Sequence, residues 1–190
     1  MAFAKKLIAS AVLGFAALGA SSVSATVLTF DDVGQGQLSN YGGLTFSNMW
    51  VTQKDAYGES GYKHGTVSGE YVAFNGYASA ATFSSATAFS LQSVMLTKAW
   101  NAGYTKFDGY VGGALTYSMN VYTPTTSPTL VNFNWTNLNS VTMSDGNGTN
   151  HSAIDNLTIN AVPEPASGAM ILGGLALMGL IGRRRSRAAK

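Results

Sequence analysis

The chain of 190 residues contains no cysteine, so neither a disulfide nor a metal site built on thiolates can form. Arginine is absent from residues 26–161, where four lysines stand against eight acidic side chains and give a formal charge of −4. A domain without a basic face is not suited to neutralise phosphates, so we expect no nucleic-acid partner. The sequence pI near 8.8 therefore reflects the basic ends of the chain.

The short motifs of common catalytic sites are also missing. The chain has two histidines, no His-Glu-x-x-His, no phosphate-binding glycine loop and no Gly-x-Ser-x-Gly turn. The eight acidic side chains of residues 26–161 make some pair of carboxylates inevitable, as glycoside hydrolysis requires, but no pair has a sequence context that singles it out. We therefore expect a protein that is not an enzyme, with an extracellular glycan-active enzyme as the alternative.

The N-terminal segment, residues 1–25, has the three parts of a secretory signal peptide. Lys5 and Lys6 provide the positive start, residues 7–20 the apolar run, and small residues lead to a cleavage site after Ala25. Signal peptidase is thus an expected partner during maturation. An uncleaved anchor helix is the alternative, but the apolar run is short for a membrane span.

The C-terminal segment, residues 162–190, combines a Pro-Glu-Pro tripeptide, an apolar run and a basic end. As a helix, the apolar run of residues 166–182 would be roughly 26 Å long, which is just enough to cross a bilayer core. The arginines that follow are expected to stop transfer and stay in the cytoplasm. The tripeptide is Pro163, Glu164 and Pro165, and the basic end, residues 183–190, contains Arg183, Arg184, Arg185, Arg187 and Lys190.

This order of tripeptide, apolar run and arginine cluster resembles the PEP-CTERM sorting tail, the signal that the membrane enzyme exosortase recognises. The resemblance implies a protein exported through the inner membrane and held there by the tail. It further implies that exosortase cuts the tail near the tripeptide and that the protein reaches the cell surface or an extracellular matrix. An ordinary C-terminal membrane anchor is the alternative.

Between the two ends, residues 26–161 show the alternation of β-strands and no amphipathic helix. In residues 130–135, for example, Val131, Phe133 and Trp135 share one face, so Trp135 is expected in the core. About ten short strands predict an all-β fold, a jelly-roll-like antiparallel β-sandwich. The expected strands are Thr26–Phe30, Leu44–Val51, Glu70–Asn75, Ala80–Ser84, Phe89–Lys98, Tyr104–Tyr110, Leu115–Tyr122, Leu130–Trp135, Ser140–Met143 and Ile154–Asn160.

Turn residues separate the expected strands. Asp108-Gly109 and Asp145-Gly146 predict hairpin turns, because glycine readily takes positive φ. Pro124 and Pro128 are expected to interrupt pairing between two strands. The longest interval without expected structure is Thr52–Gly69, and a loop of that length is usually functional or mobile.

The order of short motifs in this middle part resembles the jelly-roll, galactose-binding-like domains of exosortase-sorted proteins. The resemblance implies the sandwich fold and extends over nearly the whole of residues 26–161. The matching pieces are TFDDV at 29–33, YGGLTFSN at 41–48, SGEYVAFNG at 68–76, KAWNAGY at 98–104, FDGYVGG at 107–113 and AIDNLTIN at 153–160.

Resemblance to jelly-roll carbohydrate-binding modules also implies a structural calcium ion between the first and last strands. Its carboxylate ligands would be Asp31 or Asp32, with Asp155, because calcium prefers oxygen ligands. The alternative is that the two adjacent aspartates start a turn and that Asp155 lies at a strand edge.

Sugar binding requires exposed aromatic rings that stack on pyranose rings, with amides or carboxylates nearby. Trp50 and Trp100 end their expected strands, and Tyr57 and Tyr62 fall in the long loop, so these four are the candidate platforms. Aromatic residues at strand ends also serve as core plugs, which is the alternative. We therefore expect a non-enzymatic surface or matrix protein that binds exopolysaccharide, with a purely structural coat protein as a further alternative.

Overall fold

The computed structural model describes residues 24–146 and 148–161, most of which lie in antiparallel strands. The predicted signal peptide up to residue 23 and the predicted tail, residues 162–190, lie outside this range. The strands are β1 (Ala25–Leu28), β2 (Gly36–Tyr41), β3 (Leu44–Gln53), β4 (Tyr71–Asn75), β5 (Ala81–Lys98), β6 (Gly103–Val111), β7 (Ala114–Thr123), β8 (Thr129–Ser144) and β9 (Ser152–Ala161), with a short helix α1 (Gly61–Gly65) and a 3-10 turn η1 (Gly76–Ala78).

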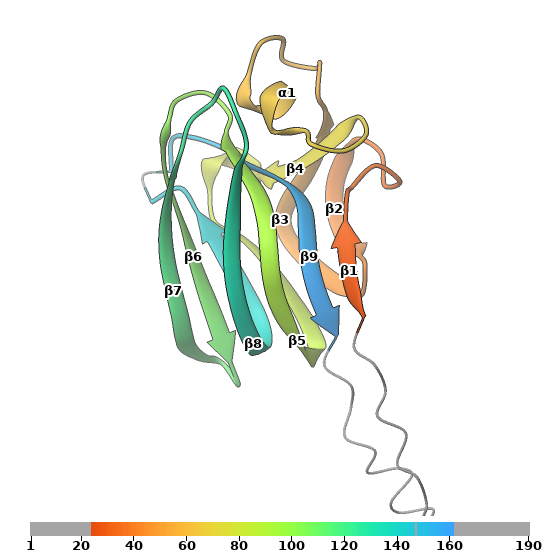
Figure 1. Ribbon diagram of the computed structural model, residues 1–190, viewed down its shortest axis with the longest axis vertical. Helices are drawn as coiled ribbons and strands as arrows, with labels where there is room; N and C mark the ends of the chain where they lie inside the picture. The colour runs from red at the N-terminus through yellow and green to blue at the C-terminus, as the bar shows by residue number, and fades with distance from the viewer. Residues whose placement is uncertain (1–23, 147, 162–190) are drawn as a thin grey trace, which may run out of the picture.

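Two long strands, β5 and β8, connect the layers of the fold. The first half of β5 pairs with β3 and the second half with β9, while β8 runs beside both halves. Pairing of β5 with β8 is interrupted between Ser84 and Phe89, and Asn134 and Asn137 of β8 take positive φ. Such irregularities let a strand bend from one layer of a sandwich into the other. The predicted all-β, antiparallel β-sandwich is confirmed (Figure 1).

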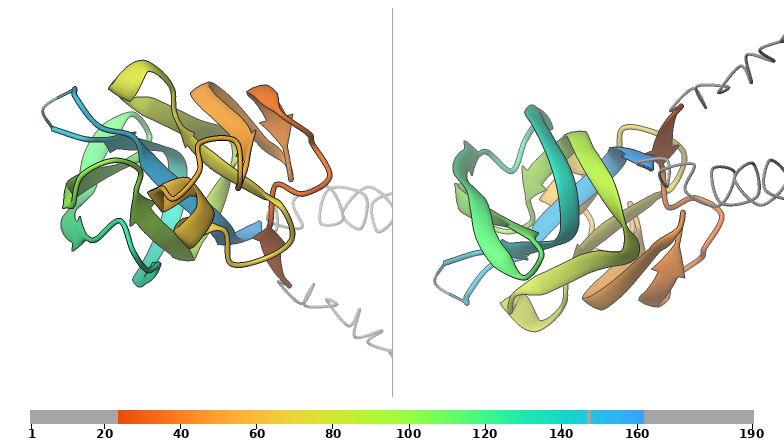
Figure 2. Two further views of the ribbon diagram at one scale, coloured as in Figure 1. Left: turned by 90° about the horizontal axis from the view of Figure 1, so that it is seen from above. Right: turned by 90° about the horizontal axis from the view of Figure 1, so that it is seen from below.

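The layers follow from these pairings. One layer contains β1, β9, the second half of β5 and the first half of β8. The other contains β2, β3, the first half of β5, the second half of β8, β6 and β7. Strand β4 pairs with both β3 and β9 and joins the layers at one edge. Viewed along the sandwich, the strands wrap around a common centre (Figure 2).

The apolar core fills the space between the layers. Along β8, Val131, Phe133 and Trp135 are buried, whereas the asparagines between them are exposed, as predicted. Phe133 lies against Phe107 with ring centroids 4.9 Å apart, and Trp135 stacks on Tyr117 at 5.2 Å. Each fully buried side chain of this kind contributes roughly 1.5–3 kcal/mol. The largest fully buried apolar side chains of this core cluster include Phe30, Met49, Phe83, Leu91, Leu96, Leu138, Met143, Ile154 and Leu157.

The strand predictions are largely confirmed, with three differences. The predicted strands Ala80–Ser84 and Phe89–Lys98 are one strand, β5, and Leu130–Trp135 and Ser140–Met143 are one strand, β8. Each prediction placed a break where the strand bends but remains in the sheet. Strand β2 was not predicted, because Leu38 is its single buried side chain and the sequence shows no alternation there.

Neither of the two predicted hairpin turns is found as a hairpin. Asp108-Gly109 lies inside β6, and the turn after β6 is formed by Gly112 and Gly113, with φ of 58° and 84°. Residue 109 is glycine for a packing reason, since a Cβ there would lie 2.8 Å from the ring of Trp135. Gly146 does take positive φ, of 79°, but its turn leads from β8 to β9, which β5 separates in the sheet, so it is not a hairpin.

The interval Thr52–Gly69 is more structured than predicted. Strand β3 continues to Gln53, and α1 packs on the end of β5. Gly61 and Gly65 permit this close packing, because a Cβ on either residue would collide with the backbone of Lys98 or the side chain of Thr97. The proline prediction is confirmed, as Pro124 and Pro128 lie in the connection between β7 and β8.

Both ends of the described chain lie at the same end of the sandwich. Strand β1 pairs with β9, and Ala25 is opposite Asn160 in this pairing. Helix α1 and the turns around it lie at the other end (Figure 1).

Candidate functional site

At the α1 end of the sandwich, aromatic side chains from separate parts of the chain form one cluster. Its centre is Tyr62 of α1, which is 1% exposed and lies against Phe74 of β4 with ring centroids 5.1 Å apart. Tyr57 and Trp100 cover Tyr62, at centroid distances of 5.1 and 5.3 Å. These two rings are 49% and 46% exposed, so they form the solvent-facing part of the cluster.

His151, just before β9, ties this cluster to the sheet. Its Nδ1 atom forms a hydrogen bond with the hydroxyl of Tyr62, and its ring stacks on Phe74 at 5.0 Å. Burial raises the pKa of Tyr62 and lowers the pKa of His151. Both groups are therefore neutral near pH 7.

Backbone hydrogen bonds join the three segments that carry these rings. The amide of Gly61 in α1 donates to the carbonyl of Ala99 at 2.9 Å. The amide of Ala99 donates to the carbonyl of His151 at 3.0 Å. These hydrogen bonds fix the positions of the three backbone segments that carry the aromatic cluster.

An apolar hollow of about 370 Å³ opens beside the cluster, lined by Trp50, Phe74, Gly76, Tyr77 and His151. The ring of Tyr77 is 77% exposed and meets Trp50 edge-on, with centroids 6.0 Å apart. Gly76 keeps the hollow open, because a Cβ there would lie 2.5 Å from the indole of Trp50.

The η1 turn presents Tyr77 in an unusual backbone conformation. Tyr77 and Ala78 take φ of 56° and 54°, a region that residues with a Cβ seldom adopt. Side-chain amides hold the turn: Asn48 donates to the carbonyl of Gly76 at 2.9 Å, and Asn75 donates to that of Ser79 at 2.9 Å. Strained residues persist where the surroundings fix them, and they concentrate at functional sites.

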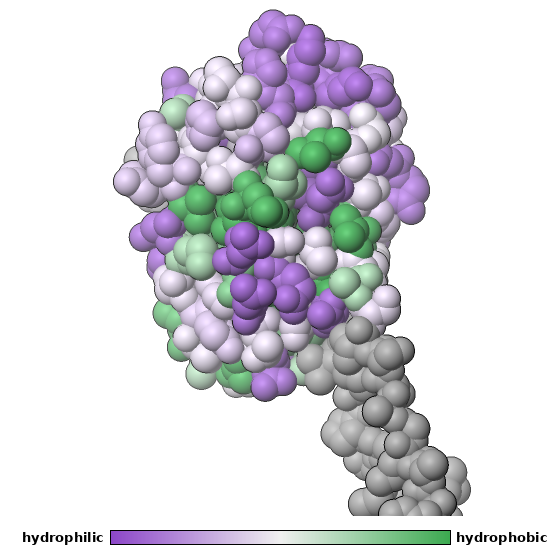
Figure 3. Space-filling view, in the orientation of Figure 1, coloured by the Kyte–Doolittle hydropathy of each residue, from purple (hydrophilic) through white to green (hydrophobic). Residues whose placement is uncertain are grey.

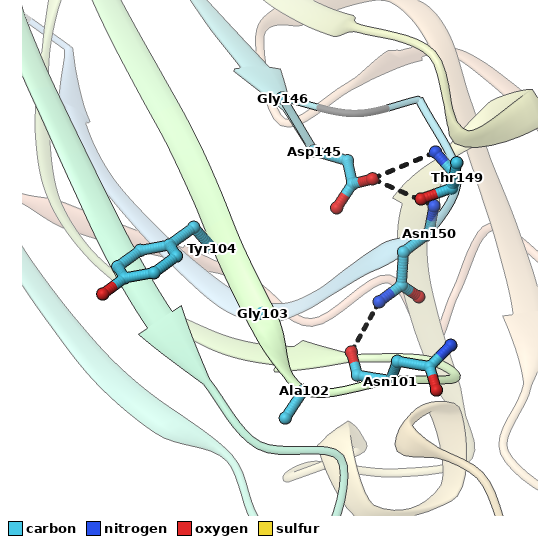
Figure 4. Close-up of a pocket in the computed structure, with 8 residues that line it drawn as sticks. All are labelled: Asn101, Ala102, Gly103, Tyr104, Asp145, Gly146, Thr149 and Asn150. Carbon is cyan, nitrogen blue, oxygen red and sulfur yellow. Dashed lines mark hydrogen bonds between the residues drawn. The ribbon is translucent and has the colours of Figure 1, made fainter.

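A second hollow, which is polar and has a volume of about 350 Å³, lies between the turn after β5 and the turn before β9 (Figure 4). The ring of Tyr104, 62% exposed, stands at one side, and the carboxylate of Asp145 lies at the other. The lining residues are Asn101, Ala102, Gly103, Tyr104, Asp145, Gly146, Thr149 and Asn150.

The walls of this polar hollow are held by hydrogen bonds of Asp145 and Asn150. Asp145 accepts from the amides of Thr149 and Asn150 at 3.1 and 3.0 Å. The Asn150 side chain accepts from the amide of Trp100 at 3.2 Å and donates to the carbonyl of Asn101 at 2.5 Å. The turn after β5 and the turn before β9 are thereby held together.

Beneath them, Lys98 and Asp145 form a buried ion pair. Lys98 also donates to the hydroxyl of Ser152 at 3.0 Å, which lies 2.7 Å from that of Thr105. Burial lowers the pKa of Lys98 even though Asp145 opposes this. Burial acts to raise the pKa of Asp145, but its hydrogen bonds from Lys98 and the two amides outweigh that effect and lower it.

The predicted calcium ligands are engaged in hydrogen bonds. Asp155 is buried and accepts from the amides of Val67 and Ser68 at 2.7 and 2.9 Å. Asp31 accepts from the amides of Glu70 and Tyr71 at 2.8 and 3.1 Å. Both carboxylates therefore hold the segment that leads into β4.

Asp32 lies elsewhere, beside Tyr41: burial and then Asp32 raise the pKa of that tyrosine. In the part of the chain that the structure describes, no three histidine, cysteine, aspartate or glutamate side chains come together as metal ligands. The amide hydrogen bonds to Asp31 and Asp155 give these carboxylates a structural role. Calcium at Asp31, Asp32 and Asp155 stays a prediction.

The predicted sugar platforms meet at the same end of the sandwich, but not as four equivalent rings. Trp50 lines the apolar hollow, and Tyr57 and Trp100 are exposed. Tyr62 is corrected from platform to core of the cluster, because its ring has no exposed face. It acts instead as the support on which the rings of Tyr57 and Trp100 rest.

Sequence reasoning missed Tyr77, Phe74, His151 and the polar hollow at Tyr104. The motif SGEYVAFNG contains Phe74 and ends one residue before Tyr77, and KAWNAGY contains Trp100 and Tyr104. Apart from Trp100, the aromatic residues of these pieces were used only to infer the fold, although they lie close to glycine and asparagine. That composition was the available signal.

The two hollows do not present a pair of facing carboxylates. Among the residues that line them, Asp145 is the one acidic side chain, and Lys98 is paired with it. Glycoside hydrolysis by acid and nucleophile or base requires two carboxyl groups across the scissile bond. The residues that line these hollows therefore do not form such a pair.

None of the curated proteins matches the chain. A solved structure, TmCBM61 in complex with β-1,4-galactotriose, is similar at 10% identity and a TM-score of 0.36, over 65% of this chain and 92% of that one. Among residues 24–146 and 148–161, no helix is both long and apolar enough to span a membrane.

The C-terminal segment gives the informative match. The PEP-CTERM protein-sorting motif is found at residues 161–186, which include the Pro-Glu-Pro tripeptide and the arginines. The sequence-based identification of the tail is confirmed. The chain therefore carries a PEP-CTERM sorting motif, which marks an exported protein that exosortase processes and sorts by way of the membrane to the cell surface.

Proposed function

We propose that this protein is a non-enzymatic component of the cell surface or extracellular matrix that binds exopolysaccharide. The observation that carries the proposal is the set of exposed rings at the α1 end, Tyr57, Trp100 and Tyr77, beside a hollow lined by Trp50. Exposed aromatic rings next to polar groups are the usual means by which proteins hold sugar rings.

The position of these rings suits a tethered protein. The chain leaves the sandwich after β9, and β9 pairs with β1, so both membrane-directed segments join the domain at one end. The aromatic rings lie at the opposite end (Figure 1). While either segment is in the inner membrane, the candidate binding end points away from it.

Two cleavages then convert the full chain into the mature domain. Signal peptidase cuts after Ala25 and leaves the folded domain to start at residue 26. The C-terminal helix, residues 166–182, and the basic end hold the intermediate in the inner membrane until exosortase cuts near Pro163–Pro165. The domain of residues 26–161 then reaches the surface or matrix.

Binding of the full chain to polysaccharides tests the proposal. The full chain, purified in detergent, is run by affinity electrophoresis in gels that contain one polysaccharide each, including polymers extracted from the native host's matrix. We expect retardation by at least one polymer. Tyr77→Ala and Trp100→Ala should each reduce the retardation, because both rings are exposed and neither is part of the main core.

Leu115→Ala is the matched control. Leu115 is a large exposed apolar side chain at the start of β7, away from the aromatic cluster. It should leave retardation unchanged. Equal loss in Leu115→Ala and Tyr77→Ala, or no retardation by any polymer, would contradict a binding site at the α1 end.

A further inference from the structure

We infer that the glycan is an uncharged, extended chain and that the polar hollow beside Tyr104 is a second subsite for it. This inference rests on the proposed function and adds the chemical class of the ligand and a second place of contact. Three features of the described residues support it: the pairing of the lysines, the sequence adjacency of residues that line the two hollows and the composition of the polar hollow.

Each lysine of the sandwich is already paired with a carboxylate. Acidic polysaccharides, which carry uronate, sulfate or phosphate groups, are held by free cationic side chains. Residues 26–161 contain no arginine and carry a formal charge of −4, so their field opposes a polyanion. The pairs are Lys54 with Glu70, Lys63 with Glu59 and Asp55, Lys98 with Asp145, and Lys106 with Asp108.

The lysines near the aromatic cluster are likewise paired with carboxylates. Hydrophilic residues gather over the α1 end in Figure 3, where the segment around α1 lies. The cations there are Lys54 and Lys63, whose ammonium groups lie 2.7 and 2.5 Å from glutamate oxygens. A neutral sugar leaves these pairs intact, whereas a polyanion would have to break them.

Residues that are neighbours in the sequence line the two hollows. Asn150 lines the polar hollow and His151, the next residue, lines the apolar one. Trp100 belongs to the aromatic cluster and Asn101, again the next residue, lines the polar hollow. Consecutive Cα atoms lie about 3.8 Å apart, so the backbone that lines one hollow continues directly into the backbone that lines the other.

The polar hollow has the parts that a sugar ring needs. The exposed ring of Tyr104 is supported by Tyr122, with centroids 5.2 Å apart, and gives an apolar face. Asn101 and Thr149 place exposed amide and hydroxyl groups on the wall. Because Asp145 and Asn150 are already held by hydrogen bonds, the hollow is formed before a ligand arrives, which reduces the entropy lost on binding.

The test uses calorimetric titration of the full chain in detergent with polysaccharides and their fragments. Neutral polymers (galactan, glucomannan and dextran) are compared with acidic ones (alginate and polygalacturonate), and the tightest neutral polymer is then titrated as its disaccharide and hexasaccharide. We expect the neutral polymer to bind more tightly than either acidic one. The hexasaccharide should bind at least tenfold more tightly than the disaccharide.

Tyr104→Ala locates the second subsite. It should weaken hexasaccharide binding about tenfold and leave disaccharide binding within twofold, because the disaccharide fills the hollow at Trp50 alone. Leu115→Ala, an exposed residue on β7 outside both hollows, is the control and should match the unmodified chain. An unchanged melting temperature verifies that each variant is folded.

The outcomes separate this inference from the proposed function. If Tyr77→Ala weakens binding while Tyr104→Ala does not, or if the hexasaccharide gains nothing over the disaccharide, the second subsite is refuted and the binding function survives. If an acidic polymer binds best, the inference of an uncharged ligand is refuted. If no polymer binds, both the inference and the proposed function are refuted.

Discussion

The ammonium group of Lys98 and the carboxylate of Asp145 form an ion pair that the sandwich buries beneath the polar hollow. Lys98 ends β5, and Asp145 follows β8 directly. Because the second oxygen of Asp145 accepts from the amides of Thr149 and Asn150, the pair also fixes the turn that leads to β9. A single buried interaction thus supports one wall of the hollow.

Lys98→Met should therefore destabilise the protein. Removing one partner of a buried pair leaves the other charge unpaired, which costs about 3 kcal/mol of unfolding free energy. Lys106→Met is the matched control, since Lys106 pairs with Asp108 at the surface and an exposed pair contributes at most about 1 kcal/mol. Urea unfolding followed by tryptophan fluorescence measures both variants, and equal losses would refute the special role of Lys98.

The buried histidine predicts a pH dependence of stability. Burial lowers the pKa of His151 in the folded state, with Asp145 opposing this effect and Lys98 reinforcing it. Below the unfolded pKa near 6.5, the unfolded chain binds a proton that the folded chain does not. The stability contributed by neutral His151 is thus present above pH 6.5 and lost as the pH falls toward the folded pKa, by at most about 1.4 kcal/mol per pH unit.

His151→Gln isolates this contribution. The fall in unfolding free energy between pH 7.5 and pH 5.5 should be smaller in His151→Gln than in the unmodified chain. Asp155 also titrates abnormally, because burial raises its pKa, but it is present in both proteins and cancels in the comparison. Identical pH profiles for the two proteins would show that His151 does not titrate differently in the folded state.

Asp155 gives a test that separates hydrogen bonding from calcium binding. Asp155→Ala removes the acceptor for the amides of Val67 and Ser68, so we expect a loss of about 3 kcal/mol of unfolding free energy. If Asp155 only accepts hydrogen bonds, the urea midpoint of the unmodified chain is the same with calcium as with EDTA. A midpoint that calcium raises in the unmodified chain but not in Asp155→Ala would establish the predicted calcium site.

The sequence predicted the parts of the fold that alternation controls. Residues 130–135 show why: Val131, Phe133 and Trp135 share a face, and each is buried. Where the pattern was weak it failed, as in β2 with its single buried residue, Leu38. The bends of β5 and β8 were interpreted as strand ends. Small and polar residues occur both where a strand bends and where it ends, so the sequence does not distinguish the two.

The site was harder to predict, because it depends on contacts between distant segments. Tyr62 was expected to be exposed, since a polar loop surrounds it in the sequence. It is buried because Gly61 and Gly65 let α1 lie directly on β5. Tyr77 was missed because its position depends on a positive φ that the side chains of Asn48 and Asn75 maintain, and no local pattern shows such contacts.

The Pro-Glu-Pro tripeptide is predicted to be required for cleavage of the sorting tail. Replacing Pro163, Glu164 and Pro165 with alanine removes the tripeptide but leaves the apolar run and the arginines, so membrane insertion should persist while cleavage fails. In a host with exosortase, the variant should stay in the membrane fraction with an intact mass that includes Lys190. The unmodified protein should appear outside the cell with a mass that starts at Thr26 and ends near Pro163. In a host without exosortase the two proteins should behave alike, and an equal yield of both in the medium of the exosortase-containing host would refute the role of the tripeptide in sorting.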